Sequence, residues 1–563
     1  MLTAPLTKLN VLINYPPIVN LFNLVYRIMR IIIKIISFWS ILVCYSSYSQ
    51  NCNCDISISK ANYFDPSNLP VKPGQTVCFS AGNYTEIRFT NIKGTASQPI
   101  KIINCGGKVN ITGYNVGVLF SDCNYVQLLG SGDATVKEGF GISATANASM
   151  GIKIEGTSSD IEVANTEVSH VGFAGIMVKS DPFCDQSNWE GNFAMFNILI
   201  HHNYIHDTGS EGMYIGSSFW NEGQEITCDG SKTLAWPHLI YGLDIHHNKI
   251  LRTAAEGIQY ACAPDAKVHH NELQHTGYNP FSVYQVNGIQ IGGGAGGDCY
   301  NNIIHDVNGT GIIMLGGLGN QQVYNNLIYN VGGNGIFSDT RPRSSENTFV
   351  RIMNNSIIST KGESIKLYSN IQQYEVYNNL LLKTPTNQYI KTNTTVKSIV
   401  SNNFTDKSID NAKLQYSNDD NYKPRLSSPL VNAGKDLSYL RVRTDLTDTL
   451  RPIGGAYDIG CYEYTGNWTV DDFIPVQELP TYPNPCSSIL FVRLEAESQF
   501  FNVKIYDGVG RLVQEHENMI AENNLLPLDM AELSPNLYLI SVTPATGNAK
   551  IAPVYRGKVL KVP

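Results

Sequence analysis

The sequence has few charged residues and no basic run outside its N-terminus. Lys, Arg, Asp and Glu make up 16% of the 563 residues, and the net charge is -8. Helical surfaces depend on Lys and Glu, so this low fraction argues against a helical protein and against a disordered one. Without a basic surface the chain offers no electrostatic footprint for nucleic acid. An anionic partner would require a local basic groove.

The sequence is instead rich in Gly, Tyr and Asn. Its 48 Gly and 31 Tyr residues, with many Asn, indicate short strands separated by tight turns. The chain is too long for one ordinary core, so we expect a large elongated domain and a small one. The glycine-rich segment at 292–297 does not follow a strand-to-helix switch, and we interpret it as a tight turn rather than a phosphate loop.

A short unit recurs between residues 141 and 405. One half is a strand that opens with Gly-Ile (below, the Gly-Ile strand), and the other half is an aliphatic strand that ends in Asn. The final Asn residues fall at 203, 248, 271, 302, 326, 355, 379 and 403. The steps between them are 45, 23, 31, 24, 29, 24 and 24 residues, so the base period is 23 to 24 with insertions.

This period predicts a solenoid. Leucine-rich repeats share it, but their consensus is absent here. Each unit contains three short runs, so we predict an all-β chain dominated by a parallel β-helix with three strands in each coil. Parallel strands stack about 4.8 Å apart, which turns equivalent residues into ladders. We expect Ile to fill the interior and Asn to bond to the next coil from the turns.

These repeats resemble the right-handed β-helix family, which includes pectate-lyase-like polysaccharide enzymes. Residues 71–113 are similar to the first coils of that superfamily, although Gly74-Gln75 stands where the family has Gly-Asp. Residues 427–437 and 451–464 are similar to a closing segment that is common after bacterial β-helices. The resemblance covers about 70 to 464. It implies the fold strongly and the activity weakly, since one fold hosts many functions.

The last 83 residues have a different composition. They open with Tyr482-Pro483-Asn484-Pro485 and continue in period-two runs, which predict a small β-sandwich. This part resembles the type A sorting domain of the type IX secretion system of Bacteroidetes. The resemblance implies that the secretion machinery is a partner and that the protein is secreted or held at the outer cell surface. A generic carbohydrate-binding sandwich is the alternative.

The N-terminus resembles an export signal. Basic residues precede an apolar stretch at 36–45, and the small residues that follow fit cleavage after Ser49. Met29 would open a compact signal, so we interpret 1–28 as an over-called start. The alternative is a membrane anchor. In chain order, the predicted parts are the signal peptide (1–49), a cap with the first coils (50–140), the repeats (141–405), a closing segment (406–464), a linker (465–480) and the sorting domain (481–563).

Three insertions interrupt the repeats, at 180–197, 217–241 and 276–287. Insertions on a solenoid mark functional loops, and the first two should rise side by side because they follow consecutive Gly-Ile strands. Cys184 and Cys228 lie in these two insertions and are our best disulfide pair. Signal removal leaves 11 cysteines, so an odd thiol remains.

The predicted substrate site combines the insertions with the Gly-Ile strands, whose alternate side chains point outward. Aromatic faces can stack on sugar rings, and outward amides and hydroxyls can bind sugar hydroxyls. The alternative for the aromatic residues is a satellite core under long loops. The predicted substrate-binding residues are Trp189, Tyr214, Trp220, Trp236, Gln259 and Gln290.

The predicted catalytic residues are Glu211, Glu256 and Lys179. Both glutamates precede a Gly in consecutive units, so strand stacking should place them about 5 Å apart. Carboxylates this close suppress each other's ionisation, and the separation suits a retaining glycosidase. Lys179 could supply the base or the cation that a lyase requires. The alternative is that both glutamates cap turns or bind a cation, for which Ca²⁺ is the candidate cofactor.

Paired histidines recur in three units, at 201–202, 246–247 and 269–270. They coincide with repeat positions and give way to Tyr and Asn later, so we interpret them as stacked ladder residues rather than a zinc site, and we assign no metal ligand. We expect a monomer that binds a polysaccharide and acts on it as a glycoside hydrolase or polysaccharide lyase. The alternative is a non-catalytic glycan-binding or adhesive surface protein.

Overall fold

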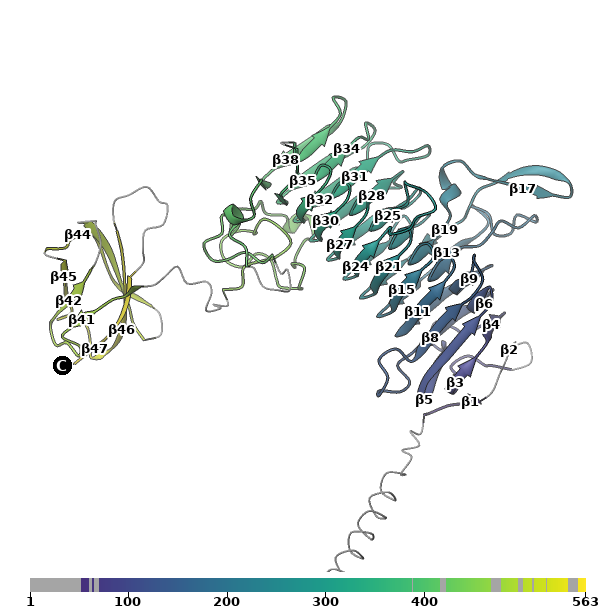
Figure 1. Ribbon diagram of the computed structural model, residues 1–563, viewed down its shortest axis with the longest axis horizontal. Helices are drawn as coiled ribbons and strands as arrows, with labels where there is room; N and C mark the ends of the chain where they lie inside the picture. Colours follow the sequence, from purple (N-terminus) through teal and green to yellow (C-terminus); the bar gives the residue numbers. More distant parts are fainter. Residues whose placement is uncertain are drawn as a thin grey trace, which may run out of the picture. The chain divides into compact units, whose positions relative to one another are not determined.

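The structure is a computed structural model, shown in Figure 1. It describes residues 52–59, 63–64, 70–386, 388–415, 422–466, 477–494, 500–508, 511–522, 524–544 and 555–562. The predicted signal peptide and its membrane-anchor alternative lie outside these residues, as does most of the predicted linker. Two compact units form, one within 1–409 and 432–462 and the other within 410–431 and 463–563. Among the described residues, no helix is both long and apolar enough for a membrane span.

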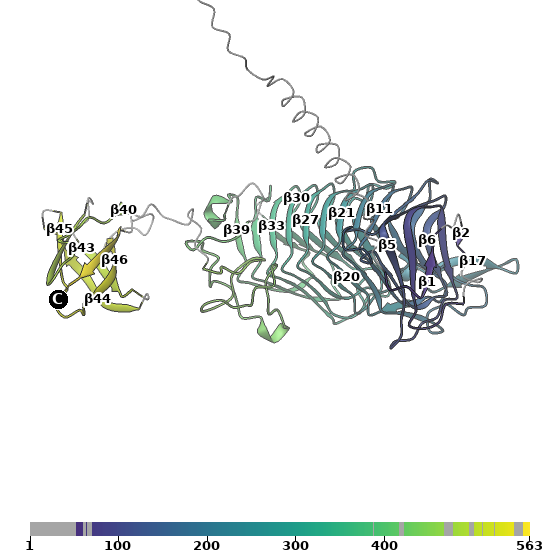
Figure 2. The same cartoon turned by 90° about the horizontal axis from the view of Figure 1, so that it is seen from below.

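The first unit consists of strands that stack coil upon coil along one axis (Figures 1 and 2). The Gly-Ile strands belong to a 12-stranded sheet, which we call sheet B. Its strands are β2 (Tyr63–Phe64), β4 (Glu86–Thr90), β6 (Val116–Ser121), β9 (Met150–Glu155), β12 (Ile176–Val178), β16 (Met213–Ile215), β22 (Ile258–Tyr260), β25 (Ile289–Ile291), β28 (Ile312–Leu315), β31 (Ile336–Asp339), β34 (Ile365–Leu367) and β37 (Ile390–Thr392).

The other strands of the coils form a 23-stranded sheet, which we call sheet A. It opens with β1 (Ile56–Ile58), β3 (Thr76–Tyr84) and β5 (Ile100–Gly113) and then divides into two columns. The first column is β7 (Asn124–Leu129), β10 (Ser159–Ala164), β14 (Ile198–His201), β20 (Asp244–His246), β23 (Lys267–His269), β26 (Gly297–Tyr300), β29 (Gln321–Tyr324), β32 (Phe349–Met353), β35 (Gln373–Tyr377) and β38 (Lys397–Ser401).

The second column is β8 (Phe140–Ala144), β11 (Thr166–Val171), β15 (Tyr204–Thr208), β21 (Lys249–Thr253), β24 (Glu272–Thr276), β27 (Ile303–Val307), β30 (Leu327–Val331), β33 (Ser356–Thr360), β36 (Leu380–Leu382) and β39 (Phe404–Asp406). Each repeat coil thus contributes three strands, and consecutive coils pair in parallel, as in β16 with β22 and β20 with β23. The predicted three-sided parallel β-helix is confirmed.

The inward side chains form one continuous core. In sheet B, Ile176, Met213, Ile258 and Ile289 occupy one register position and are fully buried. A single apolar cluster extends from Ile58 to Leu381. Each coil covers its apolar face only with its neighbours, so stability is close to a sum of coil and interface contributions.

The repeated Asn residues form a buried ladder beside this core, which we call the asparagine ladder. The side-chain oxygen of each Asn accepts hydrogen bonds from the backbone N–H and the amide of the preceding ladder Asn, as Asn302 does from Asn271 at 3.1 and 3.0 Å. The same pattern joins Asn203 to Asn248 and continues to Asn403. The predicted coil-to-coil role of Asn is therefore confirmed.

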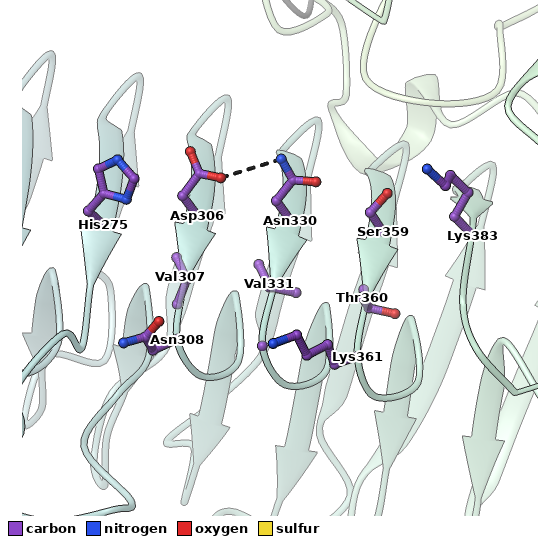
Figure 3. A pocket seen from close by; sticks show the side chains of 11 residues that line it. His275, Asp306, Val307, Asn308, Asn330, Val331, Ser359, Thr360, Lys361 and Lys383 are labelled. Carbon is purple, nitrogen blue, oxygen red and sulfur yellow. Dashed lines mark hydrogen bonds between the residues drawn. The ribbon is translucent and has the colours of Figure 1, made fainter.

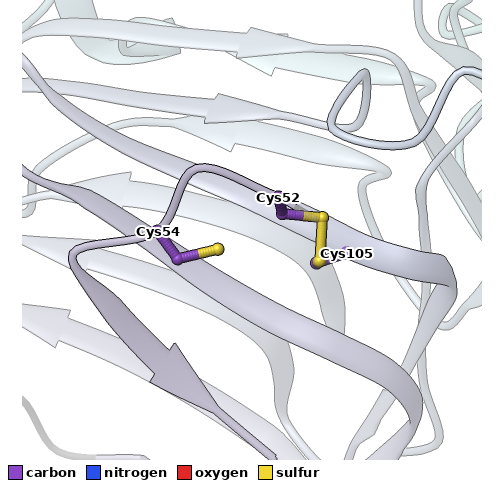
Figure 4. A group of neighbouring side chains, drawn as sticks. All are labelled: Cys52, Cys54 and Cys105. Carbon is purple, nitrogen blue, oxygen red and sulfur yellow. A yellow bond between two sulfur atoms is a disulfide. The ribbon is translucent and has the colours of Figure 1, made fainter. Parts of the chain in front are cut away.

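Three disulfides tie the first unit together. Cys184 pairs with Cys228, as predicted, and the cap has two further bonds, Cys54–Cys78 and Cys52–Cys105. Figure 4 shows the Cys52–Cys105 bond beside Cys54. Cys52 and Cys54, although close in sequence, therefore form two separate disulfides rather than a metal site. Of the described cysteines, Cys123, Cys262, Cys299, Cys461 and Cys486 are buried and free.

The second unit contains the C-terminal β-domain. A five-stranded sheet has the order β40 (Gln477–Glu478), β47 (Tyr555–Lys561), β46 (Asn536–Pro544), β43 (Phe500–Tyr506) and β44 (Leu512–Ile520). A three-stranded sheet has the order β41 (Thr481–Tyr482), β42 (Ile489–Arg493) and β45 (Leu525–Asp529). One buried cluster, which includes Leu490, Phe501 and Ile540, draws side chains from both sheets. This arrangement matches the predicted small sandwich.

Candidate functional site

The first two insertions lie side by side, as the sequence predicted. They join β12 to β14 and β16 to β20, and they pair in parallel through β13 (Ala194–Phe196) and β19 (Leu239–Tyr241). The second insertion also contains the turn η2 (Ser218–Asn221) and a hairpin of β17 (Gln224–Cys228) and β18 (Ser231–Ala235). The Cys184–Cys228 disulfide links the two insertions covalently. They therefore form one fixed structure.

An arginine from a distant coil holds this structure in place. The Arg343 guanidinium lies 4.0 Å from the ring centre of Trp220 and 4.3 Å from that of Trp236. It also donates to both carboxylate oxygens of Glu190, at 2.9 and 2.7 Å, and to the Trp220 carbonyl at 2.9 Å. An arginine stacked on aromatic rings and bound to a carboxylate through two nitrogens is a strong structural contact.

The three predicted tryptophans serve this structure in different ways. Trp220 is buried in a small cluster with Ala261 and Cys262, so it follows the satellite-core alternative. Trp236 stacks on Arg343, and the Trp189 ring nitrogen donates to the Phe183 carbonyl at 2.7 Å. Both of these rings remain half-buried. Phe219, at the tip of η2, is 43% exposed and offers a freer ring face than any of the three.

A hydrogen-bonded polar chain lies on the outer side of sheet B at the base of the second insertion. Tyr214, Gln259 and Gln290 share one outward register position in consecutive coils. The Tyr214 hydroxyl lies 2.7 Å from Ser218 Oγ, which accepts from Gln259 Nε2 at 3.0 Å. Gln290 Nε2 donates to Gln259 Oε1 at 3.0 Å. Gln259 is only 1% exposed, so Ser218 and Gln290 are the residues of this hydrogen-bonded group that a ligand can reach.

Glu211 and Glu256 lie in consecutive coils, as predicted. The N–H of Gly212 donates to the Glu256 carbonyl at 2.9 Å, which fixes their adjacent register. Both side chains are 0% exposed, a burial that the sequence did not predict. A substrate can therefore reach these two carboxyl groups only if a covering segment moves.

The burial of this pair leaves polar atoms without partners. Within the described residues, both oxygens of Glu211, Oε2 of Glu256 and the nearby Ser210 hydroxyl make no well-aligned hydrogen bond, although Ser210 and the Glu211 backbone lie close enough to the Glu211 carboxyl group to oppose the effect of burial on its pKa. Asn287 Nδ2 donates to Glu256 Oε1 at 3.2 Å. Burial, together with the charge of Glu211, raises the pKa of Glu256 to about 8, and burial also raises the pKa of Glu211. The pair thus favours a bound proton at neutral pH, and its free oxygens are also the donor type that Ca²⁺ prefers.

The third insertion, residues 276–287, lies against the same corner of the coil. The N–H of Gly277 donates to the Ala255 carbonyl at 2.8 Å, and Asn287 Nδ2 also donates to the Tyr284 carbonyl at 3.0 Å. Its apolar side chains point into solvent: Tyr278 is 52% exposed, Phe281 69%, Val283 78% and Tyr284 82%. Sequence reasoning recognised this insertion but did not single out its exposed aromatic residues, which the run YNPFSVY contains.

Lys179 lies at the edge of the same face of sheet B. Its ammonium pairs with Asp181 at 3.0 Å and lies 5.9 Å from the ring centre of Phe219. Lys153, in the preceding coil, pairs with Glu155. A cationic edge therefore borders the polar chain, although each ammonium already has a carboxylate partner.

A separate polar groove crosses the C-terminal ends of strands in the second column of sheet A. Its volume is about 560 Å³, and its wall contains one residue from each of five consecutive coils (Figure 3). These residues are His275, Asp306, Asn330, Ser359 and Lys383. Each has a positive φ between 52° and 59°, which turns the chain outward at the same point in every coil. None of these five positions was singled out from the sequence.

Two family models match the chain. One describes a right-handed β-helix region and matches residues 240–405, and the other describes a secretion system C-terminal sorting domain and matches 480–552. The chain is a right-handed parallel β-helix protein with a C-terminal sorting domain. The sorting domain directs this β-helix protein to the type IX secretion system and so to the cell surface or beyond. The predicted fold and location are thereby confirmed.

Several solved structures are similar to the β-helix protein at low identity. A GH136 lacto-N-biosidase from Eubacterium ramulus is 11% identical, covers 62% of this chain and 67% of its own, and has a TM-score of 0.36. Pectate lyase Pel9A is 12% identical, the match covers 73% of this chain and 96% of the lyase, and the TM-score is 0.37. A PL6 family polysaccharide lyase from Pseudopedobacter saltans is 12% identical, the match covers 74% of this chain and 100% of the lyase, and the TM-score is 0.35.

No curated protein sequence matches the β-helix protein. The TM-scores above are below 0.5, so these structures carry no argument about its activity. Its chemistry has to be inferred from its own residues.

Proposed function

We propose that this protein binds an extracellular polysaccharide on the outer side of sheet B, beside the joined insertions, and cleaves it there. The observation that carries this proposal is the Glu211–Glu256 pair: two adjacent buried carboxyl groups, three of whose oxygens make no well-aligned hydrogen bond. Buried carboxyl groups without partners destabilise a fold. Their presence in only two of the repeat coils fits a chemical role better than a structural one.

The raised pKa of Glu256 gives the pair complementary roles. A carboxyl group with a pKa of about 8 keeps its proton at neutral pH and can donate it to a leaving glycosidic oxygen. Glu211 would act as the nucleophile or base on the same bond. In this scheme Ser218, Gln290 and Lys179 bind sugar hydroxyl or carboxylate groups at the border of the site.

Access to the pair is the step that this scheme requires. Asn287 joins Glu256 to the third insertion, so movement of residues 277–286 would uncover the carboxyl groups. The exposed rings of that insertion, Tyr278, Phe281 and Tyr284, offer apolar faces on which a sugar chain can stack. Substrate binding to the rings would then promote the movement that admits the reacting bond.

The test is a screen of the purified protein on neutral and uronic-acid polysaccharides. New reducing ends would indicate a hydrolase, and ultraviolet-absorbing unsaturated products would indicate a lyase. Glu256→Gln should abolish turnover. The control is Glu363→Gln, because Glu363 occupies the equivalent position four coils later but pairs with Lys391 at 3.0 Å. Full activity of the folded Glu256→Gln variant would remove this residue from the mechanism.

A second candidate function is glycan binding without cleavage along the polar groove of Figure 3. The groove presents polar side chains from consecutive coils, as an extended polar ligand would require. Binding without product formation, weakened by Lys361→Ala with Lys383→Ala but not by Glu256→Gln, would favour this function over catalysis.

A further inference from the structure

We propose that the six paired histidines of sheet A form a binding site for a late divalent transition metal, with Cu²⁺ as the tightest ligand and Ni²⁺ as the next. The six residues are His201, His202, His246, His247, His269 and His270, and we call them the histidine ladder. They are half of the 12 histidines in the chain. This site is separate from the carboxylate pair and does not depend on the proposed polysaccharide activity.

The histidine ladder consists of two parallel stacks of imidazole rings. His201, His246 and His269 stack at 4.8 and 5.0 Å between ring centres, and His202, His247 and His270 stack at 4.9 Å. The stacking that the sequence predicted is therefore present. Within each coil the two rings stand nearly perpendicular, at 87°, 88° and 82°.

The perpendicular rings bring their Nδ1 atoms together in every coil. The Nδ1–Nδ1 distances are 2.8 Å for His201–His202, 2.9 Å for His246–His247 and 2.7 Å for His269–His270. Two nitrogens bound at about 2.0 Å and at right angles to one ion lie about 2.8 Å apart, whereas tetrahedral angles separate them by about 3.3 Å. The observed spacing is that of a hydrogen bond between the two rings, and it also fits two adjacent ligands of a square or octahedral Cu²⁺ or Ni²⁺ ion better than ligands of tetrahedral Zn²⁺.

Carboxylates on the far side of the rings direct these nitrogens inward. Asp244 Oδ1 lies 3.1 Å from His269 Nε2, and Asp448 Oδ1 lies 3.1 Å from His270 Nε2. A carboxylate favours a proton on the nitrogen that it contacts, so the Asp244 contact favours an unprotonated Nδ1 on His269. His270 Nε2 also lies 3.0 Å from the donating amide of Asn301, so the Asp448 contact alone does not set its tautomer. At 2.7 Å the two Nδ1 atoms can share a proton in a hydrogen bond or bind one cation in its place.

A third nitrogen is available to each pair. The ligand atoms of His201, His202 and His246 lie within 4.8 Å of one another, and the same holds for His247, His269 and His270. Neutral imidazole is the form of histidine that binds metal.

The later coils show why the ladder is open to an ion. The positions that follow His270 in the same column are Asn301, Asn325, Asn354, Asn378 and Asn402, and their amides donate to carbonyls of the segment 433–458. No such backbone contact covers His202 or His247 among the described residues, and both are exposed. His202 and His247 thus occupy the part of the column that this segment leaves uncovered, whereas His270 contacts the segment through Asp448.

The test is equilibrium dialysis of the full chain, prepared without a polyhistidine tag, against CuCl₂, NiCl₂ and ZnCl₂ in turn. We expect up to two Cu²⁺ per chain, an axial electron paramagnetic resonance spectrum with nitrogen hyperfine splitting, and weaker binding of Zn²⁺ than of Ni²⁺. The variant His269→Tyr with His270→Asn carries the residues of the next coil, Tyr300 and Asn301, and should fold normally. It should lose one Cu²⁺ or bind it at least tenfold more weakly.

The matched control is His305→Tyr, which removes a histidine outside the ladder and again installs the residue of the next coil, Tyr329. It should bind Cu²⁺ like the wild type. The proposal is overturned if the ladder variant binds as much Cu²⁺ as the control, or if the wild type shows no nitrogen splitting. Zn²⁺ binding tighter than that of Ni²⁺ would overturn the assigned geometry.

Discussion

Two buried polar columns of the same solenoid, the asparagine ladder and the Glu211–Glu256 pair, obey opposite rules. Every Asn from 203 to 379 passes its hydrogen bonds to the next coil, and Asn302 is 0% exposed with both of its amide atoms bonded. The glutamates are equally buried, yet three of their four carboxyl oxygens make no well-aligned hydrogen bond among the described residues. The asparagine ladder thus supplies hydrogen bonds to its own buried polar atoms, whereas the glutamate pair does not.

The difference separates structural from chemical polarity in a repeat protein. A ladder that recurs in eight coils spreads a satisfied network along the core and stabilises it. A pair confined to two coils loses stability through desolvation, since a raised carboxyl pKa is a free-energy cost of folding above the ordinary pKa. Removing a residue of the asparagine ladder should therefore lower stability, whereas neutralising a glutamate of the pair should raise it.

The largest effect should come from breaking the asparagine ladder. Asn302→Ala removes the acceptor for two bonds from Asn271 and the donor to the Val268 carbonyl. Each buried group left without a partner costs about 1–3 kcal/mol, so the unfolding free energy should fall by roughly 5 kcal/mol. Denaturant unfolding measures this loss. The exposed Asn393→Ala is the control and should stay within about 0.5 kcal/mol of the wild type.

The second effect should have the opposite sign. Between the unfolded pKa of about 4.3 and the folded pKa of about 8, native Glu256 holds a proton that the unfolded chain has lost. Native stability therefore falls with rising pH, by about 1.4 kcal/mol per unit for this group. Glu256→Gln abolishes that dependence, so the variant should gain on the wild type by about 4 kcal/mol from pH 5 to pH 8.

Comparing the variant with the wild type cancels the other titrating groups, such as the buried histidines, whose pKa values shift downward. Repeating the unfolding experiment with Ca²⁺ and with a chelator distinguishes a shared proton from a bound cation. Stabilisation of the wild type by Ca²⁺ at pH 8, absent in Glu256→Gln, would assign the free oxygens to the ion. A constant difference between variant and wild type across this pH range would contradict the raised pKa.

A third and smaller loss of stability tests whether the joined insertions are independent of the asparagine ladder. Arg343→Ala removes the contacts with Glu190, Trp220 and Trp236, and should cost about 2 kcal/mol. Hydrogen exchange should accelerate in residues 217–241 and stay unchanged in the strands of the asparagine ladder. The neighbouring Arg341→Ala is the control. Equal acceleration in both regions would show that the insertions also support the ladder.

The sequence predicted the features that repeat and missed those that depend on single distant contacts. The period of the Asn residues predicted the three-strand coil, the ladder and the stacking of His201 on His246, since each follows from local register. It also predicted the Cys184–Cys228 pair, because the two insertions start from neighbouring strands. The burial of Glu211 and Glu256 was not predicted, because the position before each Gly was expected to face outward, whereas Ala174 and Asn287 at the same position in adjoining coils are buried as well.

Arg343 illustrates the same limit. It lies 123 residues from Trp220, in an irregular segment after β31, and nothing in its local sequence indicates that it will stack between two rings. The disulfides of the cap were missed for a related reason, since spacing alone does not assign partners for Cys52 and Cys54. The positive-φ corners that line the groove of Figure 3 follow the repeat, but no residue type marks them, since His, Asp, Asn, Ser and Lys all occupy them.

The smallest effect concerns a column that tolerates two residue types, unlike either column above. His247 has a φ of 53°, and the same column carries Asn at 301, 325 and 354 with φ between 51° and 55°. Asn adopts this left-handed conformation more readily than most residues, which offsets the loss of ring stacking with His202 and His270. His247→Asn should therefore change the unfolding free energy by less than about 0.5 kcal/mol without added metal. A loss above 1 kcal/mol would show that imidazole stacking itself stabilises the coil, and the histidine ladder would then join the asparagine ladder as a structural column.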